Sequence, residues 1–196
     1  MIGKPLRRKE DERLITGRGR YVDDVVLPNP LHVVFVRSPH ARARILSVDT
    51  RAAKSLPGVT VFVSEDLPEL ANPVPPFSEP ESNPYADFNS PPPQLALARG
   101  EVRYVGEAVA AVVAEDRYRA ADAAEAVRVE YEPLPALVDA ERAMAEGAPQ
   151  LHAGRSNVVG HIKVSIGDWE RALAQADVVV EERLTYARVT SMPMET

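Results

Sequence analysis

The four histidines are the first residues to consider for chemistry, because imidazole both binds metals and transfers protons near neutral pH. They are His32, His40, His152 and His161, and no two have the spacing on a helix, four positions apart, that points two imidazoles at one ion. The sequence contains no cysteine, which excludes thiolate-bound zinc, iron–sulfur ligation, disulfides and a cysteine nucleophile within it. The pattern therefore does not favour a metal site.

A second candidate is the pair Ser38 and His40, which could supply a nucleophile and its base. Residues two apart share a face only while a strand continues, and Pro39 between them breaks the strand. We therefore predict a turn at this position rather than a catalytic dyad.

The segment Gly17-Arg18-Gly19 begins like a phosphate-binding loop. The third glycine of such a loop is missing, and no strong strand precedes the segment. A tight turn leading to Tyr21 is the better interpretation.

Carboxylates are numerous, but they fall at solvent-facing or turn positions, and a general acid needs surroundings that shift its pKa. No residue is therefore assigned a catalytic, cofactor-binding or metal-binding role. The carboxylates in question include Asp23, Asp24, Glu130, Glu132, Glu181 and Glu182.

The composition describes a globular chain of 196 residues, 45% hydrophobic, with a net charge of −6. An acidic chain opposes binding to nucleic acid or to an anionic membrane. Its basic N-terminus, Lys4 to Lys9, runs directly into Glu10-Asp11-Glu12, so we read a solvated mixed-charge arm that docks on a partner. No secretory signal or membrane-spanning stretch is visible. We expect a soluble, cytoplasmic protein, which the absence of cysteine suits.

The elements that would position these residues begin with strands. The segments 31–38 and 43–49 are rich in β-branched residues and are separated by the Ser38–His40 turn. Residues 50–55 are too short and polar to predict a helix, whereas Val59–Val63 reads as a buried strand after the turn Leu56-Pro57-Gly58.

A proline-rich stretch interrupts this pattern, with nine of the 18 prolines between Pro68 and Pro93. Regular structure cannot propagate there, and we read it as a long excursion that packs on something else. Strand-like sequence then resumes at 102–105, and the apolar run Ala108–Ala114 requires burial on both faces.

The second half of the chain alternates short helices and strands. Asp116 and Asp168 are the expected N-caps of two predicted helices. A third, shorter helical segment begins at Asp139. The predicted helices are 116–126, 139–146 and 169–176, and the predicted strands are 127–132, 157–165 and 178–190. The last strand leads into Met192-Pro193-Met194-Glu195-Thr196 without a turn, a cap or a polar tail, which we read as an interruption.

The order of several short motifs resembles the opening of the large subunit of a molybdenum hydroxylase, the carbon monoxide dehydrogenase, xanthine dehydrogenase and aldehyde oxidase family. Each motif is weak alone, but together they keep register over about 180 residues. Two departures occur: Ala108 replaces a usual proline, and Arg42 replaces a commoner histidine or small residue. The motifs are Leu14–Asp24, Phe35–Ile45, Leu56–Val59, Val102–Ala110, Tyr131–Pro135, Gly167-Asp168, Ala176–Glu181 and Pro193–Glu195.

The resemblance implies an α+β fold, an α/β hammerhead with a mixed sheet, followed by the start of the molybdenum-cofactor-binding domain. The domains expected from it are an N-terminal arm at 1–14, the hammerhead at 15–135, a linker at 136–156 and a truncated molybdopterin-binding domain at 157–196.

The resemblance also implies that the cofactors lie outside these residues. The family holds molybdopterin cytosine dinucleotide and molybdenum through glycine-rich segments, a glutamine-bearing loop and a late glutamate, none of which matches a position here. Its 2Fe-2S clusters and FAD belong to partner subunits or domains, which agrees with the lack of cysteine. The expected partners are the remainder of the molybdenum subunit and the iron–sulfur and flavin subunits, with a homo-oligomer through the terminal strand as a further option.

Three hypotheses for function follow. A structural part of the large subunit predicts an apolar exposed patch around residues 178–196 and a gain of stability when the remaining polypeptide is supplied. A stand-alone binding module predicts a monomer in which the backbone groups of the terminal strand form their hydrogen bonds within the same chain. An independent small enzyme requires a cluster of perturbed titratable groups in a pocket.

Overall fold

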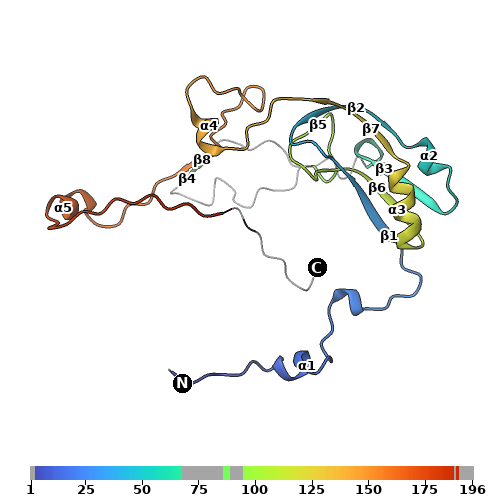
Figure 1. The fold of residues 1–196 in the computed structure, drawn as a ribbon, viewed down its shortest axis with the longest axis horizontal. Helices are drawn as coiled ribbons and strands as arrows, with labels where there is room; N and C mark the ends of the chain where they lie inside the picture. Colours follow the sequence, from blue (N-terminus) through green and yellow to red (C-terminus); the bar gives the residue numbers. More distant parts are fainter. Residues whose placement is uncertain (1–2, 68–85, 89–94, 188, 190–196) are drawn as a thin grey trace. The chain divides into compact units, whose positions relative to one another are not determined.

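The computed structural model describes residues 3–67, 86–88, 95–187 and 189, and the chain divides into two compact units, residues 31–175 and residues 1–30 with 176–196. Figure 1 labels the elements of both units. The strands are β1 (His32–Arg37), β2 (Ala43–Asp49), β3 (Val59–Val63), β4 (Ala86–Phe88), β5 (Glu101–Val102), β6 (Ala108–Ala114), β7 (Arg128–Pro133) and β8 (Gly160–Ile162). The helices are α1 (Asp11–Ile15), α2 (Arg51–Lys54), α3 (Arg117–Glu125), α4 (Ala140–Met144) and α5 (Trp169–Ala174), with short 3-10 turns at Val22–Asp24 and Ser64–Asp66.

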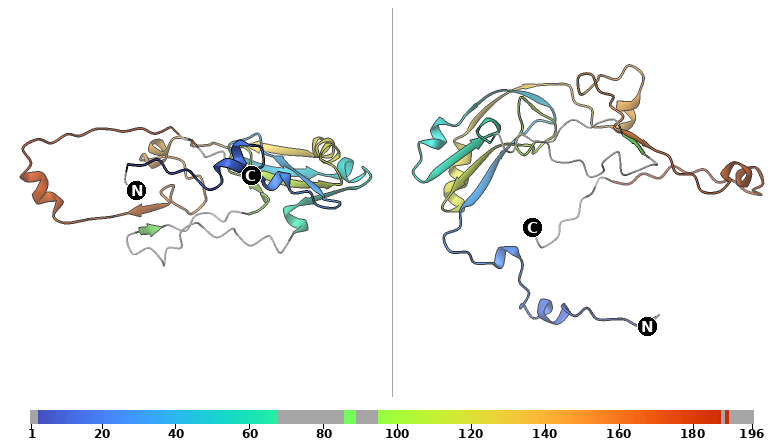
Figure 2. Two further views of the ribbon diagram at one scale, coloured as in Figure 1. Left: turned by 90° about the horizontal axis from the view of Figure 1, so that it is seen from below. Right: turned by 180° about the vertical axis from the view of Figure 1, so that it is seen from behind.

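One sheet has the strand order β1-β6-β3, with both pairs antiparallel. The predicted two-sided burial of β6 is confirmed, because five of its seven residues are buried and the other two are half-buried. Helix α3 lies along β1 and β6 (Figures 1 and 2), so its Ala120 and Ala123 are fully buried. Alanines at these positions let the helix approach the sheet closely.

The second sheet has the order β5-β2-β7 and is also antiparallel. The turn after β1 therefore leads the chain from one sheet into the other, and β1 and β2 do not pair. The α+β class is confirmed, but every strand pair among the described residues is antiparallel, so the sheets are not mixed.

The core has two apolar clusters that meet at β6. On one face, Ala110 and Val112 pack with residues of α2, α3 and β3; on the other, Val109 packs with Ala43 and Val102. Burying this apolar surface, at about 25 cal/mol per Å², is the main favourable contribution to folding of this unit.

The predicted helix caps are confirmed at Asp116 and Asp168. The Asp116 carboxylate accepts hydrogen bonds from the backbone N–H of Tyr118 and Arg119, at 3.0 and 2.9 Å. Asp168 accepts from Arg171 N–H at 3.0 Å, and Asp139 caps α4 in the same way. Each cap satisfies amides that the first helical turn leaves without partners.

Two predictions about irregular regions were wrong. Residues 50–55 contain the single-turn helix α2, which forms because Ala53 is fully buried against the core. Within the proline-rich stretch, Ala86–Phe88 forms β4 and pairs with β8, since no proline lies between Pro84 and Pro91. The rest of that stretch lies outside the described residues.

Three other segments are shorter than predicted, and the first is the strand expected at 102–105, of which only Val102 lies in β5. The strand expected at 157–165 is reduced to β8, and the strand expected at 178–190 has no regular structure over its described residues, 178–187 and 189. The segments 157–165 and 178–190 contain several β-branched residues, but such a segment forms a regular strand only when a neighbouring strand supplies hydrogen bonds. Among the described residues, no helix has the length and hydrophobicity needed to cross a bilayer.

Candidate functional site

The predicted turn at Ser38–His40 is confirmed, and it occupies the Ser38 hydroxyl. Ser38 Oγ donates to the His40 carbonyl oxygen at 3.1 Å and accepts from the His40 backbone N–H at 3.0 Å. The His40 ring instead packs edge-on against Tyr131, with ring centroids 5.0 Å apart. The serine proton is therefore directed to a carbonyl oxygen and not to an imidazole, an arrangement that stabilises the turn.

The same turn contacts the segment before β6. Ser38 N–H donates to the Glu107 carbonyl oxygen at 2.9 Å, and Gly106 N–H donates to the Ser38 carbonyl oxygen at 2.8 Å. Gly106 has a φ of +90°, a conformation that glycine adopts without strain. Two segments nearly 70 residues apart in the sequence are thus joined at one point, which we call the turn junction and define as residues 38–40 with 103–107.

Glu107 is the buried acid of the turn junction, with only 3% of its surface exposed. Its carboxylate accepts from the Arg103 backbone N–H at 2.5 Å and lies 3.5 Å from the Arg103 guanidinium. A buried carboxylate needs such donors, because charge is costly to remove from water. Sequence analysis missed this residue; its position between the Gly106 turn and a two-sided buried strand was the available signal.

The Tyr131 hydroxyl also lies in this buried region and has no hydrogen-bond partner of good geometry. Burial raises the pKa of Tyr131 above its usual value, and the nearby Ser38 hydroxyl opposes the rise. The phenol therefore stays neutral and contributes its ring to packing.

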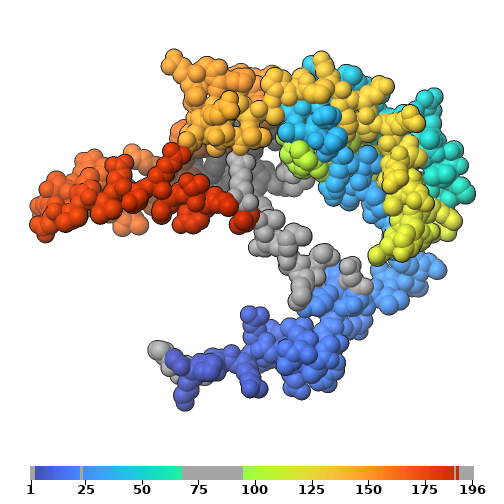
Figure 3. Space-filling model, in the orientation of Figure 1, coloured from blue at the N-terminus to red at the C-terminus, as the bar shows by residue number. Residues whose placement is uncertain are grey.

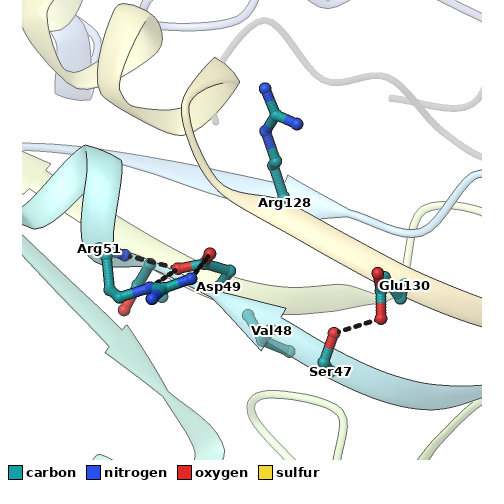
Figure 4. Close-up of a pocket in the computed structure, with 7 residues that line it drawn as sticks. Ser47, Val48, Asp49, Arg51, Arg128 and Glu130 are labelled. Atoms are coloured by element: carbon teal, nitrogen blue, oxygen red, sulfur yellow. Dashed lines mark hydrogen bonds and ion pairs between the residues drawn. The ribbon is translucent and has the colours of Figure 1, made fainter.

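A shallow groove of about 590 Å³ lies where β2 leads into α2 and borders β7 (Figure 4). In it, Arg51 donates to both carboxylate oxygens of Asp49, at 3.0 and 2.7 Å, while Ser47 donates to Glu130 at 2.9 Å. The hydrogen bonds from Arg51 hold the pKa of Asp49 well below its usual range, with a smaller contribution from Arg128. Asp49 is therefore always ionised near neutral pH and is unsuited to proton transfer.

The structure does not bring the sequence candidates together. The four histidines lie on β1, in the turn after it, in the loop after α4 and on β8. No group of three or more metal-binding side chains occurs among the described residues. Glu130 and Glu132 are exposed, as predicted, and Gly17 with φ of +70° ends α1 in a turn, as predicted.

Large apolar side chains are exposed throughout the described part of 159–189. Val178, Val180 and Leu184 keep about three-quarters of their surface accessible, and Ile166 keeps 88%. Figure 3 shows this part of the chain in orange and red. Exposed apolar side chains in such numbers are typical of segments that bind another polypeptide. The other members are Val159, Ile162, Val164, Trp169, Leu173, Val179, Tyr186 and Val189.

Residues 16–135 match the sequence model of the aldehyde oxidase and xanthine dehydrogenase a/b hammerhead domain. The chain belongs to this family. The match includes β1 to β3, β5 to β7 and the turn junction, where two of the family motifs, Phe35–Ile45 and Val102–Ala110, meet through backbone hydrogen bonds.

Relatives within the family act on different compounds according to their names. The chain is 41% identical, over 99% of its length, to the 6-hydroxypseudooxynicotine dehydrogenase complex subunit gamma of Paenarthrobacter nicotinovorans, and 41% identical, over its whole length, to the carbon monoxide dehydrogenase large chain of Afipia carboxidovorans. It spans about a quarter of these relatives, 24% and 25% of their lengths.

Solved structures of the family share the fold. A Cu,Mo-CO dehydrogenase is 46% identical with a TM-score of 0.59, covering 75% of this chain and 17% of that one. The aldehyde oxidoreductase of Desulfovibrio gigas is 28% identical with a TM-score of 0.68, covering 87% of this chain and 19% of that one. The expected molybdenum-hydroxylase hammerhead is therefore confirmed.

Proposed function

We propose that this chain is a structural part of the large subunit of a molybdenum hydroxylase, of the carbon monoxide dehydrogenase-like branch, and that it does not catalyse a reaction alone. In this proposal the arm is residues 1–14, the hammerhead 15–135 and the linker 136–156, while 157–196 begin the molybdopterin-binding domain. The high identity to large chains of the family supports the assignment.

The observation that carries the proposal is the contrast between two parts of the chain. The hammerhead has two buried apolar clusters at β6, whereas no described residue of 159–189 is buried. A stand-alone module would satisfy its terminal strand internally, and the described residues of 178–189 form no strand pair. An independent enzyme would gather its perturbed groups in one pocket, but among the described residues with shifted pKa values only Asp49 and Arg51 line the groove.

The cofactor of the parent enzyme belongs to the proposal, with molybdopterin cytosine dinucleotide and molybdenum in the large subunit and 2Fe-2S clusters and FAD on partner subunits. The parent enzyme would hydroxylate carbon, or oxidise carbon monoxide, with water-derived oxygen. The glycine-rich segments, glutamine-bearing loop and late glutamate that hold this cofactor in the family match no position here, and no group of three metal-binding side chains occurs among the described residues. We therefore assign this chain no step of that reaction and no cofactor-binding, metal-binding or catalytic residue.

The proposed partners are the rest of the large subunit and the iron–sulfur and flavin subunits, in the cytoplasm. The exposed apolar surface supports the first of these directly. Pairing of the terminal segments of two copies is the competing use of that surface, and the test below distinguishes the two.

The first prediction is that the remaining large-subunit polypeptide, supplied by co-expression, raises the melting temperature of this chain, because it covers the exposed side chains. The purified chain alone is expected to contain neither molybdenum nor pterin by elemental and fluorescence analysis. Stoichiometric molybdenum in the chain alone would overturn the assignment.

A variant pair sharpens this test. The double change Val180→Asp and Leu184→Asp is expected to abolish the gain in melting temperature without changing the stability of the isolated chain, since both side chains are exposed there. Val26→Asp, also exposed, is the matched control. Analytical ultracentrifugation of the isolated chain tests the competing use of this surface, self-association. A chain that sediments as a dimer, and as a monomer when it carries both substitutions, would favour self-association.

A further inference from the structure

The connection between the hammerhead and the residues after it contains a loop that one side chain, Asn157, closes. Its side-chain oxygen accepts from Leu151 N–H at 3.0 Å, and its side-chain nitrogen donates to the carbonyl oxygens of Ala143 and Pro149 at 3.0 and 3.1 Å. The most distant of these backbone groups lies 14 positions earlier in the sequence. An amide suits this role because it accepts and donates at once, whereas a carboxylate only accepts.

Two turns inside the loop bring these backbone groups together. Ala148 N–H donates to the Ala145 carbonyl oxygen, and Arg155 N–H donates to the His152 carbonyl oxygen, both at 3.1 Å. Each turn contains a glycine in the left-handed conformation, with φ of +77° in the first and +71° in the second. A loop of this length whose ends lie close together is an Ω-loop. Residues 143–157 are therefore a closed unit and not an extended linker.

The connection is also held where it leaves the hammerhead. The Arg42 carbonyl oxygen accepts from Leu134 N–H at 3.0 Å, and the Arg42 guanidinium donates to the Pro135 carbonyl oxygen at 3.3 Å. Glu101 of β5 orients that guanidinium, since its carboxylate oxygen lies 2.7 Å from Arg42 Nε. The backbone and the side chain of Arg42 thus fix the first residues after β7.

Strand pairing holds the far end of the connection. Strand β8 begins three positions after Asn157 and pairs antiparallel with β4, which lies between β3 and β5 in the sequence (Figures 1 and 2). A two-stranded sheet of three residue pairs is marginal by itself, so it depends on what fixes the ends of its strands. Asn157 fixes the end from which β8 starts.

Large apolar side chains follow directly after this fixed point. Each of them keeps about half or more of its surface exposed, so they form an apolar segment that we define as residues 159–173. The conformation of its first residues depends on the loop, because the segment begins two positions after Asn157 and contains β8. Its large apolar members are Val159, Ile162, Val164, Ile166, Trp169 and Leu173.

We propose that Asn157 is a positioning residue: by closing the loop 143–157 it holds β8 in register with β4 and preorganises the start of the apolar segment for binding to the rest of the large subunit. The identity of that partner rests on the proposed function. A segment that is ordered before it binds loses less conformational entropy on binding. Opening the loop should therefore weaken association although no side chain of the apolar segment has changed.

Hydrogen exchange of the full chain, followed by mass spectrometry, tests the closure. Asn157→Asp keeps the shape and the acceptor but turns a carboxylate oxygen toward two carbonyl oxygens. Protection of peptides containing the Leu151 amide and β8 should fall roughly tenfold. Unchanged protection in this variant would overturn the proposal.

A matched control lies in the same loop. Gln150→Glu also converts an amide into an acid and adds the same charge, but at an exposed position, so protection should stay at the native level. An equal loss in Gln150→Glu would show that charge, and not closure by Asn157, is responsible. Peptides of β6 report any global unfolding. Asn157→Ala removes the three hydrogen bonds without adding charge and decides the question if Asn157→Asp also loses protection in β6.

Affinity for the remaining large-subunit polypeptide separates positioning from stability. Isothermal titration calorimetry should show binding roughly tenfold weaker for Asn157→Asp, while the melting temperature of the isolated chain stays the same. Native affinity in a variant whose loop has opened would overturn the positioning role. Failure of the native chain to bind this polypeptide would instead contradict the proposed function, and the exchange data would still judge the closure.

Discussion

The Ser38 hydroxyl and the His40 ring lie two residues apart, and neither is directed at the other. The hydroxyl closes the turn through backbone groups, and the ring packs on Tyr131. At the scale of single residues, the polar groups nearest to the core are used to join segments. Glu107 is the strongest example, because its side chain and its carbonyl oxygen bind different segments.

We predict that Glu107→Gln lowers the free energy of unfolding by about 2 to 4 kcal/mol, since it removes the charge that Arg103 faces in a nearly dry position. Urea denaturation measures the change. Glu125→Gln, at an exposed position of α3, should change the stability little. An equal effect of the two substitutions would contradict the role given to the turn junction.

A second prediction at this scale concerns the cap of α3. Hydrogen bonds from the Arg119 and Tyr118 amides lower the pKa of Asp116, the first of these being the largest cause. Because the folded-state pKa is depressed, the contribution is complete above about pH 4 and disappears as the pH falls.

Asp116→Ala should therefore lower the melting temperature by a few degrees at pH 7, and the difference from the native chain should shrink near pH 3. Thermal melts followed by circular dichroism provide the measurement. Asp122→Ala, at an exposed position of the same helix, is the control. A difference that stays constant with pH would rule out the carboxylate cap as the cause.

At the scale of elements, β6 is the strand on which the hammerhead depends. Val109 packs on one side and Ala110 and Val112 on the other, so no residue of its central part faces water freely. The sheet β1-β6-β3 and the cluster around Val102 therefore share one strand.

Val112→Ala is expected to cost about 2 to 3 kcal/mol, from two lost methyl groups and the cavity that remains. Val33→Ala, on the exposed side of β1, should cost less than half as much. Equilibrium denaturation of both variants compares them directly. Similar losses would show that β6 is less tightly packed than its burial indicates.

The elements that the sequence predicted well are those whose pattern and boundaries are local. Val59–Val63 and Ala108–Ala114 are apolar runs, the first preceded by a proline–glycine turn and the second by Gly106, and both strands have the predicted limits. The antiparallel order of the strands was not predictable, because it depends on pairing between distant segments.

The wrong predictions share a physical cause. Helix α2 forms because Ala53 fits into the core, and no propensity signals that contact. Residues 178–187 have the composition of a strand but lack a strand partner among the described residues. Glu107 was missed because a glutamate is usually read as a surface residue.

At the scale of the whole molecule, the part of the chain that contains the buried core differs from the part that exposes its apolar side chains. The family match and the buried core coincide in residues 16–135, whereas the residues after β8 present apolar side chains outward. Arg42 forms hydrogen bonds with Leu134 and Pro135, at the position where the family match ends. The chain spans about a quarter of the length of these relatives, and its buried core precedes a segment whose described apolar side chains are exposed.

The position of β6 in the chain also sets the route by which this base assembles. Val112 is aligned with Val61 and with Val34, which precede it by 51 and 78 positions. Such remote pairings require closure of long loops before any hydrogen bond rewards the ordering, and neither β1 nor β3 can gain its partner in this sheet before β6 is available. Refolding should thus be slow for a unit of this size. A nascent chain that ends before Ala114 would lack the complete β6, so the backbone groups of β1 and β3 would be left without their partner strand and open to aggregation.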